Sequence, residues 1–176
     1  ILRYNLSDFN HTSTLGEEVQ IVKEYFFIQQ TRFGERIQFI SEIEEDALSA
    51  EVPCLILQPL IENAFIHGVE SYEKNGEIHL YIARRNKQII VEIIDNGVGM
   101  DDQTKQKLMS YMNERNSIDS FESNKEKSPV STGIGVKNVI RRLQLFYQRN
   151  AQVEIESELN KGTTFRLFIP DFQKGK

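Results

Sequence analysis

The chain has 176 residues, 39% of them apolar, which is enough for one domain with a continuous core and excludes a disordered tail. Its 21 Lys and Arg against 26 Asp and Glu give a net charge of −5, which argues against binding to nucleic acid. The single cysteine, Cys54, excludes an internal disulfide and a four-cysteine zinc site, and it suits a reducing compartment. No apolar run reaches the length of a membrane span, about 18 residues, and the start has no signal-peptide pattern. Because the chain begins with Ile1 rather than Met, we expect it to be a fragment of a longer protein.

The N-terminal part predicts a helix followed by a strand. Residues 1–13 look like the end of an element that begins further upstream. Thr14 and Glu17 form a capping-box pattern that starts a helix running to about Arg32. The apolar stripe of this helix consists of Leu15, Val19, Val22 and Phe26. Partial alternation over residues 37–43 predicts a strand.

The middle of the chain predicts a buried helix and a hairpin. A nearly continuous apolar run after Pro53 reads as a helix ending at Gly68, in which Pro59 marks either a kink or the first turn. Two runs rich in Ile, Val and Tyr, 77–83 and 88–94, are separated by a polar connection and predict a β-hairpin.

The C-terminal part predicts a helix over 102–113, a second helix over 136–149, and strands over 152–157 and 163–169. Residues 114–132 have no sustained period, and so long a connection is either disordered or a functional lid. The order of elements predicts an α/β two-layer sandwich: a mixed, mainly antiparallel sheet with helices on one face.

The first of three glycine-containing polar clusters contains Glu62, Asn63, His67 and Gly68. Buried Glu and Asn need partners, so their place in an apolar helix requires an explanation. They either cap a loop or face solvent, or Asn63 supplies an oxygen ligand to a hard cation such as Mg²⁺.

The second cluster follows an apolar strand and contains Asp95, Gly97, Gly99 and Met100. Asp-Asn-Gly by itself is an ordinary turn. Alternatively, it places a carboxylate at the edge of the sheet, beside backbone that can approach a ligand closely.

The third cluster leads directly into a helix and contains Gly133, Ile134, Gly135 and Val136. Glycines before a helix N-terminus expose amides to an anion such as phosphate. A single GxG pattern is weak support for such a site, although a phosphate-contacting lid would need the mobility that the preceding residues suggest.

The order and spacing of the three clusters are more specific than any one of them. E-N-A-x-x-H-G, D-N-G-x-G-M, G-I-G-V-K-N-V and K-G-T-T-F resemble the nucleotide-binding boxes of the ATPase superfamily that unites gyrase, the heat-shock chaperone, the mismatch-repair ATPase and histidine kinases. More narrowly, Gln58-Pro59-Leu60 before Glu62-Asn63, and Leu2-Arg3-Tyr4 near the start, are similar to motifs of LytS/YesM-type sensor histidine kinases.

This resemblance implies a role for each matching residue. Asn63 would coordinate the Mg²⁺ that bridges the phosphates of ATP, and Asp95 would accept a hydrogen bond from the amine of adenine. Gly97 and Gly99 would let the backbone close over the base, and Thr164 would hold the base through a water shared with Asp95. The remaining implied ATP-binding residues are Met100, Gly133, Ile134, Gly135 and Val136.

Two residues of the first polar cluster are candidate catalytic residues. Glu62 would orient the acceptor histidine or a magnesium-bound water, and His67 would either contact phosphate or simply end the helix. Hydrolytic members of the superfamily carry a Glu four residues before the metal-binding Asn, where this chain has Pro59. Proline cannot accept a proton from water, which favours a kinase over a hydrolytic ATPase.

The resemblance thus implies the ATP-binding catalytic domain of a two-component sensor kinase, which donates the γ-phosphoryl group to a histidine absent from this chain. Residues 1–13 would end the dimerisation and phosphoacceptor region, 14–172 would form the catalytic domain with a lid at 114–132, and 173–176 would be a tail. Because none of the three histidines lies in an acceptor motif, we expect no autophosphorylation of this chain alone. The alternatives are a hydrolytic conformational ATPase and a docking module that binds no nucleotide.

The expected partners are a response regulator and the dimerisation and phosphoacceptor domain of the parent chain, with no nucleic acid. The expected location is the cytoplasmic side of a membrane-anchored parent, without direct contact between this part and the membrane.

Overall fold

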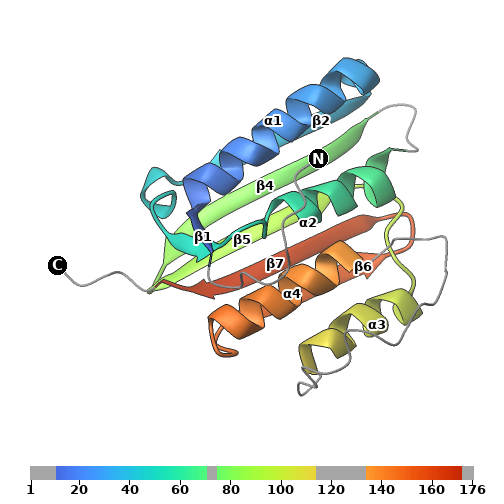
Figure 1. The fold of residues 1–176 in the computed structure, drawn as a ribbon. Helices are drawn as coiled ribbons and strands as arrows, with labels where there is room; N and C mark the ends of the chain where they lie inside the picture. The colour runs from blue at the N-terminus through green and yellow to red at the C-terminus, as the bar shows by residue number, and fades with distance from the viewer. Residues whose placement is uncertain (1–10, 71–74, 114–133, 172–176) are drawn as a thin grey trace.

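The computed structural model describes residues 11–70, 75–113 and 134–171 (Figure 1). A five-stranded sheet runs through this part in the order β2-β4-β5-β7-β6. The β2–β4 pair is parallel and the other three pairs are antiparallel. The strands are β2 (Ile37–Ile43), β4 (Gly76–Arg85), β5 (Gln88–Asp95), β6 (Gln152–Glu158) and β7 (Gly162–Pro170).

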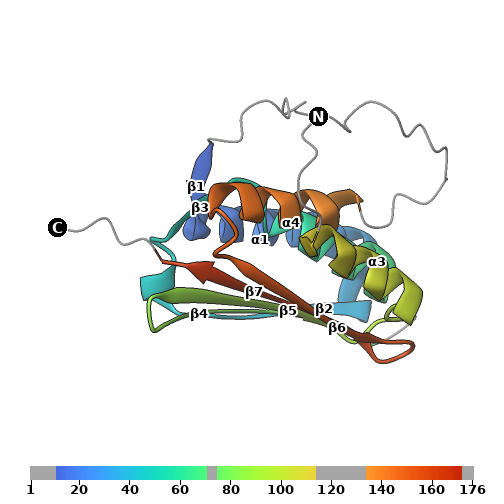
Figure 2. The same ribbon diagram turned by 90° about the horizontal axis from the view of Figure 1, so that it is seen from below.

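The helices all lie on one face of this sheet, as the edge-on view in Figure 2 shows. They are α1 (Leu15–Phe33), α2 (Gln58–Asn63), α3 (Asp102–Asn113) and α4 (Ile134–Phe146). A π-helical segment, η3 (Ala64–Val69), continues α2 directly. Short 3-10 turns are η1 (Gly34–Arg36) and η2 (Glu45–Ala47). The predicted two-layer sandwich with a mixed, mainly antiparallel sheet is therefore confirmed.

The core lies between the helices and the sheet. The predicted stripe of α1 is buried throughout, with Leu15, Val19, Val22 and Phe26 between 0% and 7% exposed. Alternate residues of β5 and β7 bury their side chains against the helices, whereas the residues between them face the uncovered side. This alternation decides which side chains near the strand ends can reach the helix layer.

The start of α1 has the predicted capping box. Thr14 Oγ1 accepts a hydrogen bond from the Glu17 amide at 3.2 Å, and the Glu17 carboxylate accepts one from the Thr14 amide at 2.7 Å. The helix ends at Phe33 rather than Arg32, followed by Gly34 at a φ of 60°. Both ends are set by local sequence signals.

The buried helix differs in detail from its prediction. It begins at Gln58, so Pro59 lies in its first turn and no kink is needed. The residues just before it form a loop in which Leu55 has a φ of 58°. Two three-residue strands, β1 (Thr12–Thr14) and β3 (Glu51–Pro53), pair antiparallel beside that loop and were not predicted.

The remaining predicted elements are present with small changes in their ends. The hairpin of β4 and β5 turns at Asn86 and Lys87, both at positive φ. Helix α3 has the predicted bounds, whereas α4 runs from Ile134 to Phe146 rather than over 136–149. The predicted lid at 114–132 and the tail at 173–176 lie outside the described residues, as do most of residues 1–13.

Candidate functional site

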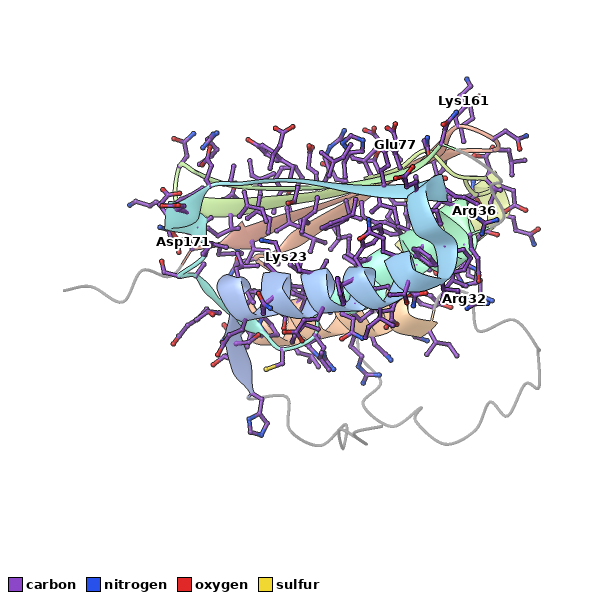
Figure 3. All side chains as sticks on the ribbon, turned by 90° about the horizontal axis from the view of Figure 1, so that it is seen from above. Lys23, Arg32, Arg36, Glu77, Lys161 and Asp171 are labelled. Atoms are coloured by element: carbon purple, nitrogen blue, oxygen red, sulfur yellow. The ribbon has the colours of Figure 1, made fainter. Side chains whose placement is uncertain are left out.

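Asp95, the last residue of β5, lies at the centre of the candidate site. Figure 3 places Arg36 and Lys161 at one end of the sheet and Asp171 at the other. Asp95 belongs to the first end, because it pairs with Thr163 just after the β6–β7 turn that carries Lys161. Only 4% of Asp95 is exposed.

The Asp95 carboxylate is buried with few partners. It accepts hydrogen bonds from the backbone amides of Gly97, at 2.9 Å, and of Thr163. Burial raises the pKa of Asp95 from 3.8 to about 6, and the two amides oppose that rise. A carboxylate has about four acceptor positions, so Asp95 keeps acceptor capacity for another donor.

Glycine backbone closes around this carboxylate. A Cβ atom on Gly68 would lie 2.8 Å from Asp95 Oδ1, and one on Gly97 would lie 2.2 Å from the carbonyl of Gly68. The Val98 amide donates to that carbonyl at 3.1 Å, which ties the loop after β5 to the end of η3. Only glycine permits backbone segments to approach this closely.

Gly99 fixes the far side of the same loop. It has a φ of 67°, and a Cβ there would meet the Glu158 carbonyl at 2.0 Å. The amide of Met100 donates to the Ser157 hydroxyl at 2.8 Å, and the Met100 side chain packs partly buried on the core. The predicted residues Gly97, Gly99 and Met100 therefore shape one loop beside Asp95.

The predicted base contact, Thr164, lies on the wrong face. Thr164 pairs with Ile94 on the uncovered side of the sheet, whereas Thr163 pairs with Asp95 on the helix-covered side and is 6% exposed. The structure therefore brings Thr163 rather than Thr164 to Asp95. Successive side chains of a strand alternate between faces, so an error of one residue reverses the side.

A hydroxyl chain orients Thr163. Ser157 Oγ accepts from the Met100 amide, and its single proton goes to the Gly162 carbonyl at 3.0 Å. The remaining contact, 2.9 Å between Ser157 Oγ and Thr163 Oγ1, makes Thr163 the donor. The lone pairs of Thr163 Oγ1 stay available to another donor. Sequence reasoning missed both residues, although the K-G-T-T-F motif contained the signal for Thr163.

Asn96 was also not singled out as a site residue. Its side chain accepts from the Glu77 amide and donates to the Asn75 carbonyl, both at 2.8 Å. Asn96 thereby fixes the end of β5 to the start of β4, so it supports the loop rather than facing the site. The Asp-Asn-Gly turn pattern was the sequence signal for it.

Asn63 and the start of α4 form a second group of predicted site residues. Pro59 and Asn63 are four residues apart and so share one face of the α2 helix. A Cβ on Gly135 would lie 3.4 Å from Pro59 Cβ, which places the first turn of α4 beside this face. Ile134 is 63% exposed and Val136 is buried. Gly133 lies outside the described residues.

The two candidate catalytic residues, Glu62 and His67, lie on other parts of the α2–η3 helix than Asn63. Glu62 accepts a hydrogen bond from Gln58 Nε2 at 2.7 Å. Burial, and then the charges of Glu62 and Glu70, raise the pKa of Tyr25 to about 12, so Glu62 lies on the side of α2 that faces α1. His67 is half-buried in η3, four residues after Asn63.

Asp95, the glycine loop and Thr163 pack closely together, and the Asp95 carboxylate keeps acceptor capacity for an N–H donor. Within residues 11–70, 75–113 and 134–171, no three His, Cys, Asp or Glu side chains gather as a metal site. The amide oxygen of Asn63 is a donor that could hold Mg²⁺ together with phosphate and water. In the same part of the chain, no helix combines the length and apolarity needed to cross a bilayer.

The fold and site define a nucleotide-binding domain of the histidine-kinase type. Residues 50–173 match the family model described as histidine kinase-, DNA gyrase B-, and HSP90-like ATPase, and residues 1–37 match the histidine kinase model. The chain therefore belongs to the histidine kinase-, DNA gyrase B-, and HSP90-like ATPase family.

Individual relatives agree with this assignment. The chain is 31% identical over 170 residues to the sensor protein kinase HptS of Staphylococcus aureus, covering 97% of this chain and 30% of HptS. It thus spans about a third of the length of that relative. Among solved structures, the catalytic domain of histidine kinase ThkA has the same fold, with a TM-score of 0.62 and 18% identity over 92% of this chain and 95% of that chain. A histidine kinase domain from Erythrobacter litoralis has a TM-score of 0.57 and 18% identity over 92% of this chain and 63% of its own.

Proposed function

We propose that this chain is the ATP-binding catalytic domain of a two-component sensor histidine kinase. The observation that carries the proposal is the buried Asp95 carboxylate, which keeps free acceptor capacity beside closely packed glycine backbone. A buried acceptor of this kind favours adenine, which offers an amine where guanine offers a carbonyl. The order of the two family matches, histidine kinase first and ATPase second, supports the same function.

Different described residues bind the base, the Mg²⁺ and the phosphates of the nucleotide. Asp95 accepts from the amine of the base, and Thr163 holds a water beside it. Asn63 supplies an amide oxygen to Mg²⁺, and the first turn of α4, with Ile134 and Gly135, offers backbone amides to the phosphates. The roles of Gly133 and of the lid at 114–132 remain predictions from the sequence.

Pro59 supports a kinase rather than a hydrolase. It occupies the first turn of α2 and packs beside Gly135, so no side chain at this position can accept a proton from water. ATP supplies the γ-phosphoryl group, and Mg²⁺ supplies charge neutralisation. This chain positions the nucleotide, and at Pro59 it carries no base that could activate water. The incoming nucleophile is a histidine of the dimerisation and phosphoacceptor domain of the parent chain.

The partner that receives the phosphoryl group from that histidine is a response regulator. One structural neighbour is histidine kinase ThkA in complex with response regulator protein TrrA, with a TM-score of 0.59 and 15% identity. The narrower assignment to LytS/YesM-type kinases stays a prediction, as does a parent anchored in the membrane with this domain in the cytoplasm.

Nucleotide binding gives the direct test. We expect Mg²⁺ with ADP, at a hundred times its dissociation constant, to raise the free energy of unfolding by about 2.7 kcal/mol, and GDP to bind more than tenfold more weakly. Asp95→Asn removes this preference. Asp102→Asn, an exposed carboxylate paired with Lys105 at 3.1 Å, is the matched control and leaves the preference intact. The measurement is thermal unfolding combined with isothermal titration calorimetry.

The kinase reaction needs a second measurement. Mixed with the phosphoacceptor domain of its own parent and MgATP, the chain should form acid-labile phosphohistidine on that domain and none on itself. Rapid steady-state ATP hydrolysis by the chain alone would favour the hydrolytic ATPase. No stabilisation by millimolar nucleotide would favour the docking module.

A further inference from the structure

Glu18 is a buried carboxylate outside the nucleotide site. Only 2% of this α1 residue is exposed. Its carboxylate accepts from the Ser13 hydroxyl at 2.8 Å and from three consecutive amides, those of Leu55, Ile56 and Leu57, at 2.7, 2.9 and 3.1 Å. Leu57 is the N-cap of α2 and no side chain of its own caps the helix. Glu18 therefore caps α2 from a different helix, with a charge that suits the helix dipole.

The loop between β3 and α2 is held from the opposite side as well. Arg142 of α4 donates to the carbonyls of Cys54 and Leu55, at 3.2 Å for the latter. Leu55 has a φ of 58°, a backbone conformation unfavourable for a residue with a Cβ, which persists only where the surroundings hold it. Residues 54–57 thus form a junction, the α1–α2–α4 junction, at which three helices are fixed to one another.

The upstream end of the described chain is fastened to the same junction. Thr12 pairs with Pro53 across the β1–β3 ladder, and the Cys54 amide donates to the His11 carbonyl at 3.2 Å. Ser13 adds its bond to Glu18. A displacement of the segment that precedes α1 therefore moves the junction with it.

The junction sets where α2 begins, and α2 carries Asn63. Asn63 follows Leu57 by six residues in a continuous helix, about 9 Å along the axis at 1.5 Å per residue. A hydrogen-bonded helix transmits a shift of its first turn along its length, so the position of the Asn63 amide depends on the capping of α2. The adenine-binding residues Asp95 and Thr163 lie on the sheet. The α2–η3 helix meets Asp95 only at Gly68, five residues beyond Asn63, so a shift that begins at Leu57 acts on Asn63 more directly than on the base.

We propose that Glu18 is a positioning residue for the metal-binding part of the site, which couples the segment upstream of α1 to Asn63. This rests on the proposed function, in which Asn63 holds Mg²⁺. If Glu18 served stability alone, its loss would lower the fraction of folded protein and leave the affinity of folded molecules unchanged. If it positions Asn63, its loss weakens the Mg²⁺-dependent share of nucleotide affinity in molecules that are fully folded.

The test uses Glu18→Gln, which keeps the shape and places an NH₂ group against backbone donors. Calorimetry at low temperature gives the affinities for ADP without Mg²⁺ and for a non-hydrolysable ATP analogue with Mg²⁺, and the stoichiometry gives the folded fraction. We expect the Mg²⁺-dependent affinity to fall at least tenfold and the Mg²⁺-free affinity to change less than threefold. In an Asn63→Ala background, Glu18→Gln should have no further selective effect.

Two more variants complete the test. Glu17→Gln alters the exposed capping box on the same helix and should change neither affinity. Glu18→Asp keeps the charge and shortens the reach, and it replaces Glu18→Gln if the latter does not fold. Equal losses in both conditions, or no loss, would overturn the positioning role. Wild-type protein that binds nucleotide no better with Mg²⁺ would instead overturn the metal part of the proposed function, and this inference with it.

Discussion

Two buried carboxylates lie at opposite ends of the α2–η3 helix, and they differ in how completely they are satisfied. Glu18 accepts four hydrogen bonds from the junction, whereas Asp95 accepts two from backbone amides. Both are less than 5% exposed. A fully satisfied buried carboxylate fixes the scaffold, whereas one with spare acceptors and a raised pKa is suited to bind a donor from outside.

The largest expected effect on the free energy of unfolding comes from removing Glu18, the carboxylate with four hydrogen-bond donors. Glu18→Ala leaves two buried amides, those of Ile56 and Leu57, and the partly buried amide of Leu55 without an acceptor. We therefore expect the free energy of unfolding to fall by about 3–5 kcal/mol. Glu17→Ala, which removes only part of an exposed capping box, should cost about 1 kcal/mol. Urea unfolding at pH 7 measures both. A Glu18→Ala loss no larger than that of Glu17→Ala would mean that water replaces the carboxylate.

Replacing Asp95 is expected to raise the free energy of unfolding, whereas replacing Glu18 lowers it. Since burial raises its pKa from 3.8 to about 6, the folded protein binds more protons than the unfolded chain between these values. The free energy of unfolding therefore falls as pH rises through this window. At pH 7 the ionised Asp95 lowers stability by up to about 3 kcal/mol. We expect Asp95→Asn to be more stable than wild type at pH 7 while losing its preference for ADP over GDP.

Urea unfolding at pH 4, 5, 6 and 7 checks this prediction. The difference between Asp95→Asn and wild type should grow from pH 4 to 6 and level off above about pH 7. A variant that is less stable than wild type at pH 7 would show that the carboxylate is satisfied after all, and the contrast with Glu18 would fail.

The smallest expected effect is a difference in ADP affinity between variants of the adjacent residues Thr163 and Thr164. Thr163→Ala removes the hydroxyl beside Asp95 and should weaken ADP binding about five- to tenfold, the equivalent of one hydrogen bond. Thr164→Ala changes the uncovered face and should stay within about twofold. Titration calorimetry of both variants decides the matter, and a larger effect at Thr164 would contradict the placement of the base on the helix-covered face.

Local signals predicted most of the fold. The capping box at Thr14 and Glu17 fixed the start of α1, and Pro59 marked the first turn of α2, because these signals act within one turn of the chain. The hairpin of β4 and β5 followed from two apolar runs around a short polar connection. Asp95, Gly97 and Gly99 lie together as expected because one loop carries all three, whereas their role in binding nucleotide stays a prediction.

The misses arise from contacts between distant parts of the chain. Glu18 looks like an ordinary surface residue of an amphipathic helix, and only the tertiary fold brings the amides of 55–57 to it. Thr163 was passed over for its neighbour because sequence alone does not fix strand register. The strands β1 and β3 are three residues long, too short to show an alternating pattern.

The end position of β6 in the sheet has a further consequence, for association between copies. An edge strand exposes unpaired backbone groups that can template pairing with another sheet. The outward-facing positions of β6 include Glu154, Glu156 and Glu158, all exposed, of which the last two form ion pairs with Arg166 and Lys161. Two such edges brought together would place glutamates opposite glutamates. This edge of the sheet is thus protected by its own charge, in a chain that is already acidic.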